Sequence, residues 1–472
     1  MKTKTACTAA LIVGLSLIHF PRALGQGSLE PPPGPPAPTM KTLDQVEART
    51  AIDPSQPGFT LPYTISQSGS YYLARNVTAT ASAVGIIITA DDVTVDLNGF
   101  ALNGAGVGTK GIDVPAARKN LTIRNGTVRG WTQGGVRADF ATNCILEKLR
   151  ASGNTGGSLV GALVAGNGSL ITDCVAASNT SSTNGIKTFS GTTIVNCSAS
   201  SNGGSGIFVG GTSTISNCTT NGNSVYGIRA FSTCTLTHCN AGSNASVGIS
   251  TGDGCTVTDC TAAVNTGSGI EVANGSTVRN CTAYSNSGGS AYGILAGVGC
   301  TLSGCTAYAN TLDGIFTLTG CSVRDCTASS NQGSGLLLGA GNTVTASTSF
   351  GNVRNGIEVG SGTAVRDCAS RSNGITGITI PSDCYVFGNN CTANAGGMAI
   401  TGAGSNNRVD SNTFSANTGG GFSGSGPQNF IIRNTAKGNG GSGFSQTYVF
   451  TLGAGDEISS VSYGNSWANY EK

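Results

Sequence analysis

The sequence predicts an all-β fold, a single-stranded right-handed parallel β-helix (solenoid) of about 16 coils, most of them 21 residues long. One phrase recurs along the chain. It is clearest at residues 269–272 (Gly-Ile-Glu-Val), 277–283 (Thr-Val-Arg-Asn-Cys-Thr-Ala) and Asn286. This period is too short for helical repeats of about 34 residues. The Gly, Thr and Asn that fill the repeat disfavour a helix, whereas apolar residues at alternate positions favour strands.

Each repeat divides into three short strands. Ile270 and Val272 share one face of a strand by its two-residue period. Val278 and Cys281 differ in parity, so the chain must bend between them, where Asn280 tolerates left-handed backbone angles. One coil alone cannot bury its inner face. Stacking coils about 4.8 Å apart buries it, and this arrangement predicts columns of equivalent side chains.

The position of Cys281 marks the register of the coils. The same slot is assigned to Asn98, Gly126, Leu149, Cys174, Cys197, Cys218, Cys239, Cys260, Cys305, Cys326, Ser347, Cys368, Cys391, Asn412, Asn434 and Ser460. A second column five residues earlier is predicted for Cys144, Cys234, Cys255, Cys300 and Cys321, with Cys384 displaced by a local insertion.

Changes in composition divide the chain into four parts. Residues 1–25 combine Lys2 and Lys4 with an apolar run and a small-x-small ending, the pattern of a secretory signal peptide. Residues 26–40 form a Pro-rich spacer, residues 41–84 an N-terminal cap, and residues 85–472 the β-helix with a C-terminal cap that includes Trp467 and Tyr470. The mature chain has no apolar run long enough for a transmembrane segment. We expect a soluble protein that is secreted, periplasmic or at the cell surface.

The first part of the mature chain carries a family resemblance. Residues 59–73 (Phe-Thr-Leu-Pro-Tyr-Thr-Ile-Ser-Gln-Ser-Gly-Ser-Tyr-Tyr-Leu) and 93–100 (Val-Thr-Val-Asp-Leu-Asn-Gly-Phe) resemble the opening of secreted bacterial proteins with right-handed parallel β-helix repeats. These belong to the pectin-lyase-like fold group. The resemblance implies the fold and no particular reaction, because that group includes lyases, hydrolases and adhesins.

Seventeen cysteines raise the question of disulfides, and removal of Cys7 with the signal leaves sixteen. In-register neighbours would lie about 4.8 Å apart, whereas the β-carbons of a relaxed disulfide lie about 3.8 Å apart. We therefore predict free thiols that act as small core hydrophobes, with a few strained disulfides as the alternative. A metal site is not predicted, because CxxC pairs are absent and a line of thiols offers no tetrahedral cluster.

Composition and charge exclude several functions. Only 10% of the residues are charged and the net charge is +2, which is not typical of a nucleic-acid-binding protein. His238 is the one histidine of the mature chain, and its place before Cys239 predicts a turn residue rather than a catalytic one. The fold group implies an Arg or Lys base beside carboxylate-bound calcium in lyases, and paired carboxylates in hydrolases. No cofactor is predicted, and Ca²⁺ enters only under the lyase alternative.

The outward position of the Gly-Ile-x-Val segment forms a third column, interpreted as a solvated face. Its predicted members are Asp113, Arg137, Leu163, Lys187, Phe208, Arg229, Ser250, Glu271, Leu295, Phe316, Leu337, Glu358 and Thr379.

Charges concentrate in one segment, residues 110–150. We interpret this segment as a charged, soluble collar near the N-terminal cap. The alternative is a shallow recess, with Trp131 as a sugar-stacking platform and Arg129 or Arg137 facing an acidic glycan. Asp113, Arg137 and Asp139 are the candidate catalytic residues if such a recess is an active site.

Two functions follow as hypotheses. The first is a non-catalytic extracellular module that binds glycans, a cell-envelope component or another protein, which the short turns favour. The second is a polysaccharide lyase or glycoside hydrolase that acts on an acidic polysaccharide. Ligand, partner and oligomeric state are left open by the sequence.

Overall fold

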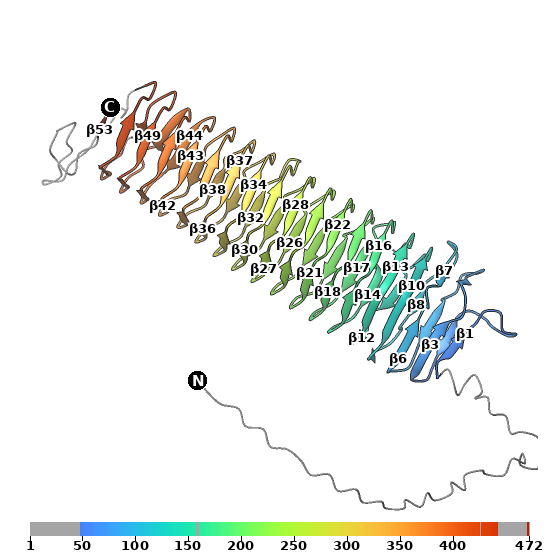
Figure 1. The fold of residues 1–472 in the computed structure, drawn as a ribbon. Helices are drawn as coiled ribbons and strands as arrows, with labels where there is room; N and C mark the ends of the chain where they lie inside the picture. The colour runs from blue at the N-terminus through green and yellow to red at the C-terminus, as the bar shows by residue number, and fades with distance from the viewer. Residues whose placement is uncertain (1–47, 157–159, 425, 442–469, 472) are drawn as a thin grey trace, which may run out of the picture. The chain divides into compact units, whose positions relative to one another are not determined.

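The computed structural model describes residues 48–156, 160–424, 426–441, 470 and 471. Strands of two to eight residues, most of them three residues long, wind into a parallel β-helix of about 18 turns, whose coils stack along one axis in Figure 1. Within the described ranges, no helix is long and apolar enough to cross a membrane. The predicted signal peptide and spacer, residues 41–47, Ser460 and Trp467 lie outside the described residues.

Three parallel ladders run the length of the β-helix, and each strand pairs with its equivalent one coil away. The first ladder contains β2 (Tyr63–Ile65), β5 (Ile86–Ile88), β8 (Ile112–Asp113), β11 (Val136–Ala138), β14 (Gly161–Ala165), β17 (Asn184–Thr188), β20 (Ile207–Val209), β23 (Ile228–Ala230), β26 (Ile249–Thr251), β29 (Ile270–Val272), β32 (Ile294–Ala296), β35 (Ile315–Thr317), β38 (Leu336–Leu338), β41 (Ile357–Val359), β44 (Thr376–Ile380), β47 (Gly396–Ile400) and β50 (Phe422–Ser423).

The second ladder contains β1 (Thr50–Ile52), β3 (Gly69–Leu73), β6 (Val93–Asp96), β10 (Thr122–Arg129), β13 (Ile145–Ser152), β15 (Leu170–Thr172), β18 (Thr193–Val195), β21 (Thr214–Ser216), β24 (Thr235–Thr237), β27 (Thr256–Thr258), β30 (Thr277–Arg279), β33 (Thr301–Ser303), β36 (Ser322–Arg324), β39 (Thr343–Thr345), β42 (Ala364–Arg366), β45 (Tyr385–Phe387), β48 (Arg408–Asp410) and β51 (Phe430–Ile432).

The third ladder contains β4 (Val77–Thr78), β7 (Ala101–Asn103), the second halves of β10 and β13, β16 (Val175–Ala177), β19 (Ser198–Ser200), β22 (Thr219–Asn221), β25 (Asn240–Gly242), β28 (Thr261–Ala263), β31 (Thr282–Tyr284), β34 (Thr306–Tyr308), β37 (Thr327–Ser329), β40 (Thr348–Phe350), β43 (Ala369–Arg371), β46 (Asn390–Thr392), β49 (Thr413–Ser415), β52 (Thr435–Lys437) and β53 (Tyr470–Glu471). A small extra pair joins β9 (Arg118–Lys119) to β12 (Ala141–Thr142).

The number of turns is slightly larger than predicted. Residues of the predicted N-terminal cap contribute β1 to β4, and these strands pair in the same ladders as the later coils. The Cα atom of Tyr63, for example, pairs with that of Ile86. The predicted count of about 16 left these early strands out because their sequence lacks the Asn-Cys-Thr phrase.

The interior is built as the repeat predicts. In the coil of β29 to β31, the inward side chains Ile270, Val272, Val278, Cys281 and Ala283 are at most 2% exposed. Each lies over its equivalent in the next coil, as Ile270 does over Ile294. Because each side of a coil contributes only about two apolar side chains, the core exists only through stacking.

The bend between the second and third strands is a single left-handed residue. Asn280 has φ of 50°, and the same corner of other coils holds Asn196, Asn217, Asp259, Asp325 and His238, all with φ between 52° and 54°. The predicted bend and the prediction that His238 is a turn residue are confirmed. Asn and Asp suit this corner because their short side chains tolerate the left-handed region.

A second left-handed corner follows the third strand, and one coil fills it with an unsuitable residue. Val264 has φ of 58°, whereas Ser243 and Ser285 occupy the corner in the adjacent coils and Gly222 fills it two coils earlier. Left-handed angles are unfavourable for a β-branched side chain. We expect Val264→Gly to raise the free energy of unfolding by about 0.5–1 kcal/mol, as measured by urea denaturation. Val175, an exposed valine inside β16, is the control: Val175→Gly should lower it.

Fifteen of the sixteen described cysteines form two buried columns, and three positions differ from the predicted register. All sixteen described cysteines are buried free thiols, as predicted. Cys391 is not in the Cys281 slot, because Asn390 pairs with Ala369 and therefore places Asn389 beside Cys368. Cys384 lies in register in the second column, since Tyr385 pairs with Ala364. At the N-terminal end, Leu97 rather than Asn98 fills the slot. Asn98 and Gly99 bulge outward as extra corner residues.

A column of buried asparagines supports the turn that follows the third strand. The side-chain amide of Asn265 donates to Oδ1 of Asn286 at 3.0 Å, and the amide of Asn286 donates to Oδ1 of Asn310 at 3.0 Å. Each amide also donates to a backbone carbonyl, as Asn286 does to Ala262 at 3.1 Å. The column comprises Asn154, Asn179, Asn202, Asn223, Asn244, Asn265, Asn286, Asn310, Asn331, Asn352, Asn373, Asn394, Asn417 and Asn439. Buried amides satisfied in this way hold successive coils in one register.

Candidate functional site

The outer face of the first ladder carries the column of side chains predicted to be exposed to solvent. Asp113 pairs with Arg137, Arg137 with Val164, and Val164 with Lys187. From Lys187 to Thr379 the predicted members are confirmed. The assignment of Leu163 to this column was wrong. Leu163 is fully buried, and Val164 occupies the outward position. The sequence pattern was misread because Ala162 stands where other coils have glycine.

The three candidate catalytic residues lie close together but are already paired with one another or with a neighbour. Arg137 forms a two-pronged ion pair with Asp139, with Nε–Oδ1 of 3.0 Å and Nη2–Oδ2 of 2.7 Å. The hydrogen bonds that Arg137 donates to the Asp139 carboxylate raise the pKa of Arg137. Asp113 accepts from Lys110 Nζ at 2.9 Å and is 8% exposed. These pairs suit a stable charged collar, and a catalytic role for the three residues stays a prediction.

Trp131 is not a surface platform, which corrects the sequence interpretation. Its side chain is fully buried, and its indole Nε1 donates to the carbonyl of Leu102 at 3.1 Å. The ring fills space that neighbouring glycines leave open. A β-carbon added at Gly108 would meet the ring at 2.4 Å, and one added at Gly104 would meet it at 2.8 Å. Those glycines were the sequence signal that could have revealed a buried ring.

The predicted ligand-binding residues also do not converge. Arg129 is exposed at the end of β10, where it pairs with Asn103 in the third ladder, whereas Arg137 lies in the first. A shallow hollow of about 420 Å³ does occur in this region. It is lined by Asn98, Gly99, Asn125, Gly126, Thr127, Lys148 and Arg150. Because Trp131, Arg129 and Arg137 are not in its lining, this hollow is not the recess considered around those residues.

A group that the sequence interpretation missed lies further along the first ladder, and we call it the aromatic–cation patch. It comprises Lys187, Phe189, Phe208, Tyr226, Arg229 and Phe231. Phe208 and Phe231 meet edge to face with centroids 5.5 Å apart. Arg229 lies 4.6 Å above the ring of Tyr226, and Lys187 lies 5.7 Å from the ring of Phe189.

The aromatic–cation patch keeps much of its apolar surface open. Phe189 is 37% exposed and Phe231 is 47% exposed. Partial burial lowers the pKa of Lys187, an effect to which the nearby Arg137 adds and which Asp139 opposes. Lys187, Phe208 and Arg229 lie within first-ladder strands, whereas the other residues of the patch lie in the turns before or after such strands. The proximity of these three positions is not visible in the linear sequence.

A pair of carboxylates occupies the same face near β35 and β41. The backbone N–H of Ser334 donates to Asp313 at 2.5 Å, and its hydroxyl donates to Glu358 at 3.2 Å. Burial raises the pKa of Asp313, with Glu358 adding to the shift, although the Ser334 N–H and Arg354 oppose it. The rings of Tyr292 and Phe316 stack beside this pair, and their centroids are 5.0 Å apart.

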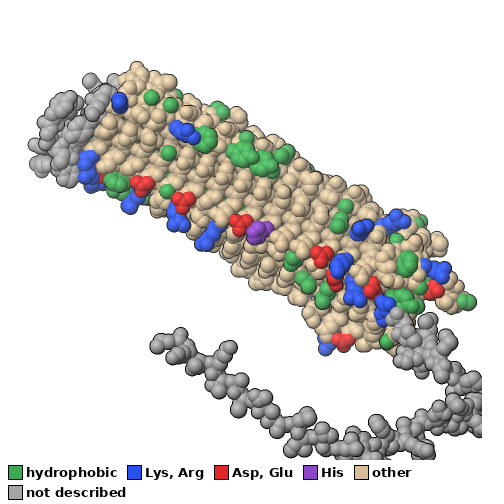
Figure 2. All heavy atoms as spheres, in the orientation of Figure 1, with side chains coloured by type: hydrophobic (Ala, Val, Ile, Leu, Met, Phe, Trp, Pro, Cys, Tyr) green, Lys and Arg blue, Asp and Glu red, His purple; other side chains and the backbone are tan. Residues whose placement is uncertain are grey.

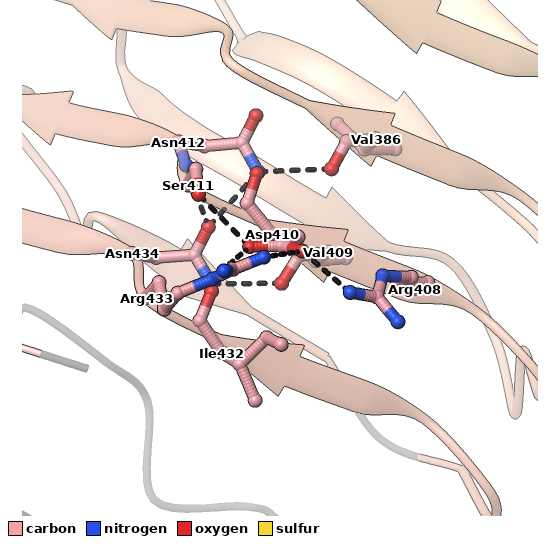
Figure 3. Close-up of polar contacts among 9 residues, drawn as sticks. All are labelled: Val386, Arg408, Val409, Asp410, Ser411, Asn412, Ile432, Arg433 and Asn434. Carbon is pink, nitrogen blue, oxygen red and sulfur yellow. Dashed lines mark hydrogen bonds and ion pairs between the residues drawn. The ribbon is translucent and has the colours of Figure 1, made fainter. Parts of the chain in front are cut away.

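Asp410, the most buried carboxylate among the described residues, is the centre of a structural ion cluster. Figure 3 shows it between Arg408 and Arg433, with Ser411 completing its contacts. Oδ2 accepts from Arg408 at 2.7 Å, and Oδ1 accepts from Arg433 Nε and the Ser411 hydroxyl at 2.8 and 2.9 Å. Burial alone would raise the pKa of Asp410, but the bonds from Arg433, Arg408 and Ser411 outweigh it and lower the pKa.

The ion cluster predicts a pH dependence of stability. Because the folded pKa of Asp410 lies below its unfolded value, the carboxylate stabilises the fold above the unfolded value of about 3.9, and this contribution is lost as pH falls through the folded pKa. Between pH 6 and pH 3 we expect the melting temperature to fall more for the wild type than for Asp410→Asn. Equal falls in both proteins would contradict the assignment.

Charged side chains are distributed unevenly. Figure 2 shows Lys, Arg, Asp and Glu spaced along one long edge of the face drawn and gathered again towards the N-terminal coils, with wide uncharged areas between. Some charged neighbours in the chain form ion pairs, for example Arg324 with Asp325 and Lys148 with Glu147. In the part of the chain that the structure describes, no group of three or more His, Cys, Asp or Glu side chains converges to hold a metal ion.

The family follows from the repeats themselves. Residues 64–231, 160–298 and 252–369 each match the family model described as the right handed beta helix region, and together they cover more than half of the chain. The chain belongs to the right-handed β-helix family. A comparison of this right-handed β-helix with curated proteins gave no match.

Several solved structures are similar to this right-handed β-helix at low sequence identity. The pectate lyase Pel9A is 18% identical over 47% of this chain and 71% of its own, with a TM-score of 0.33. The Azotobacter vinelandii mannuronan C-5 epimerase AlgE4 A-module is 13% identical over 82% and 91%, with a TM-score of 0.34. The pre-mature bacteriophage phi29 gene product 12 is 11% identical over 81% and 69%, with a TM-score of 0.41. These likenesses concern the fold alone.

Proposed function

We propose that this right-handed β-helix is a non-catalytic, exported module that binds acidic polysaccharides through the aromatic–cation patch. The observation that carries the proposal is the interleaving of Lys187 and Arg229 with four aromatic rings on one open face. Aromatic rings stack on the apolar faces of sugar rings, and guanidinium and ammonium groups pair with uronate carboxylates. One face therefore offers both kinds of contact.

The geometry of the patch favours a chain laid along the axis. Phe208 lies between Lys187 and Arg229 in the strand register, so the two cations are two coils apart, roughly 10 Å. One coil rises by about the length of one pyranose residue. Alternate carboxylates on one side of a uronate polymer can thus reach successive cations while the sugars between them contact Phe208 and Phe231.

Affinity electrophoresis tests the proposal with polygalacturonate and alginate as acidic probes and dextran as a neutral one. We expect retardation by the acidic polymers, weakening with salt, and a loss of about tenfold or more in affinity for Arg229→Ala and Phe231→Ala. The matched controls are Tyr308→Ala, an aromatic that is 37% exposed like Phe189 but lies in the third ladder, and Arg324→Ala. Equal losses in the controls, or no retardation of the wild type, would reject the proposal.

The same polymers test the enzyme alternative. New reducing ends or unsaturated-uronate absorbance would show turnover and replace the binding module with a hydrolase or lyase. Variants would then locate the chemistry. Arg137→Ala and Asp113→Ala test the residues predicted from the sequence, and Glu358→Gln tests the carboxylate bound to Ser334.

A further inference from the structure

The shallow hollow near the N-terminal coils lies at the corner between the second and third ladders, on β10 and β13. Its volume of about 420 Å³ is within the range of about 300–1,000 Å³ that is typical of small-molecule sites. The lining contains two cations, Lys148 and Arg150, and no carboxylate or aromatic ring. The aromatic–cation patch lies on the first ladder, so the hollow is a separate candidate site.

The hydrogen-bond donors of the hollow are available to a ligand. Arg150 is exposed, and its Cα atom pairs with that of Thr127. In the part of the chain that the structure describes, neither the Arg150 guanidinium nor the Thr127 hydroxyl has a polar partner. Lys148 pairs with Glu147 at 3.0 Å but is 59% exposed, and its ammonium group carries three donors. A ligand can therefore compete with this surface ion pair, which contributes little to stability.

Lys148 occupies a corner of the coil that suits other residue types. Its φ of 51° lies in the left-handed region, where the same corner holds Asn196 and Asp259, each with φ of 53°. Arg433 is the one other Lys or Arg with such an angle among the described residues, and its charge pairs with Asp410. An unfavourable backbone angle retained under a long cation is typical of residues kept for binding.

A buried carboxylate fixes the wall of the hollow. Asp96 is 5% exposed and accepts from the backbone N–H of Asn98 at 2.8 Å and from the Asn125 amide at 3.3 Å. Asn98 and Asn125 both line the hollow. Arg124 Nε donates to the same carboxylate at 3.1 Å and balances its charge. Lys148 and Arg150 therefore determine the sign of the potential inside the hollow.

The donors suit a tetrahedral oxyanion better than a carboxylate. An ester of sulfate or phosphate presents three acceptor oxygens, whereas a carboxylate presents two. The lining offers donors from three side chains, those of Thr127, Lys148 and Arg150. Because Asn125 donates its amide to Asp96, its side-chain oxygen remains to accept from a sugar hydroxyl.

We propose that the hollow binds a sugar unit that carries a sulfate or phosphate ester, with the oxyanion between Lys148 and Arg150. The guanidinium binds two oxygens in parallel, and the ammonium group binds as a point charge. The sugar ring lies over Gly99, where an added β-carbon would meet no atom within 4 Å. This site goes beyond the proposed function, because it shares no residue with the aromatic–cation patch.

Saturation-transfer NMR titration of the full chain tests the proposal, with Arg229→Ala and Phe231→Ala present throughout to remove the patch. The probes are galactose 6-sulfate, galactose 6-phosphate, galacturonate and galactose. We expect the two esters to bind, galacturonate to bind more weakly and galactose not to bind, with affinities that fall as salt is added. The second pKa of a phosphate ester is about 6, so lowering the pH from 7.5 to 5 should weaken binding of the phosphate and not of the sulfate. The tighter ester at pH 7.5 identifies the preferred oxyanion.

Variants locate the binding. Arg150→Gln and Lys148→Gln should each weaken binding of the esters about tenfold or more. Thr127→Tyr should do the same without a change of charge, because the ring fills the hollow. The matched controls are Arg279→Gln, an exposed arginine of β30, and Thr282→Tyr, at the equivalent strand position of β31. Both controls should retain the affinity.

Four outcomes would overturn the proposal. The esters could bind no more tightly than galactose, galacturonate could bind at least as tightly as both esters, the hollow variants could keep their affinity, or the controls could lose as much affinity as the hollow variants. Circular dichroism confirms that each variant is folded. Because the patch is removed throughout, failure of polysaccharide binding at the patch leaves these results unchanged.

Discussion

Replacement of Asn310 by leucine is expected to lower the free energy of unfolding by about 2–6 kcal/mol, although leucine has nearly the shape of asparagine. Oδ1 of Asn310 accepts from both the backbone N–H and the side-chain amide of Asn286, at 3.1 and 3.0 Å. The substitution leaves these two buried donors without an acceptor, and each such group costs about 1–3 kcal/mol. Thermal and urea denaturation followed by far-UV circular dichroism measure the effect.

The matched control for Asn310 is an asparagine on the outer face. Asn221 is exposed in β22, so Asn221→Leu should change the free energy of unfolding by no more than about 0.5 kcal/mol. If both variants unfold at the same midpoint, the asparagine column does not stabilise the coil and its hydrogen bonds are incidental.

Trp131→Ala is expected to lower the free energy of unfolding by about 3–5 kcal/mol, because it empties the buried space beside Gly104 and Gly108 and removes the donor to Leu102. Trp131→Phe should cost less, since it keeps the ring but leaves the Leu102 carbonyl unsatisfied. Denaturation curves of the three proteins measure the order.

The affinity of Trp131→Phe for polysaccharide also tests whether Trp131 is a buried core residue or the surface platform considered from the sequence. Below the melting temperature of the variants, affinity for acidic polysaccharide should be the same for Trp131→Phe and the wild type. Weaker binding with an unchanged melting temperature would place the ring at the ligand and contradict its burial.

The fold was predictable because it depends on one period. Ile270, Val278 and Cys281 recur in a 21-residue pattern whose parity requires strands and a bend, and the bend lies at Asn280. The errors occurred where a corner contains extra residues or where the phrase appears out of register. Asn98 and Gly99 add residues to one corner. Residues 390–392 repeat the Asn-Cys-Thr phrase two residues beyond the slot that Asn389 fills, so counting from that phrase shifted Cys391 by two positions.

The candidate site was predicted less well, because it depends on contacts between coils and not on the repeat. The ion pair of Arg137 and Asp139 joins residues of one strand and its turn, and their proximity was accessible from spacing. The aromatic–cation patch combines Tyr226 before a strand, Arg229 within it and Phe231 after it. Its formation requires the curvature of a coil and the stacking of the next, which composition does not encode.

The in-register pairing has a consequence for how such a molecule can change its length. Thr256 pairs with Thr277, and Thr261 pairs with Thr282. Deletion of the 21 residues from Thr256 to the residue before Thr277 would therefore join the chain at equivalent positions of neighbouring coils. Every interior column would lose one member and keep its order. Loss of a single residue would instead turn the inward side chains of a strand towards water. Gene duplication and deletion can therefore lengthen or shorten the rod in whole windings while point deletions are selected against.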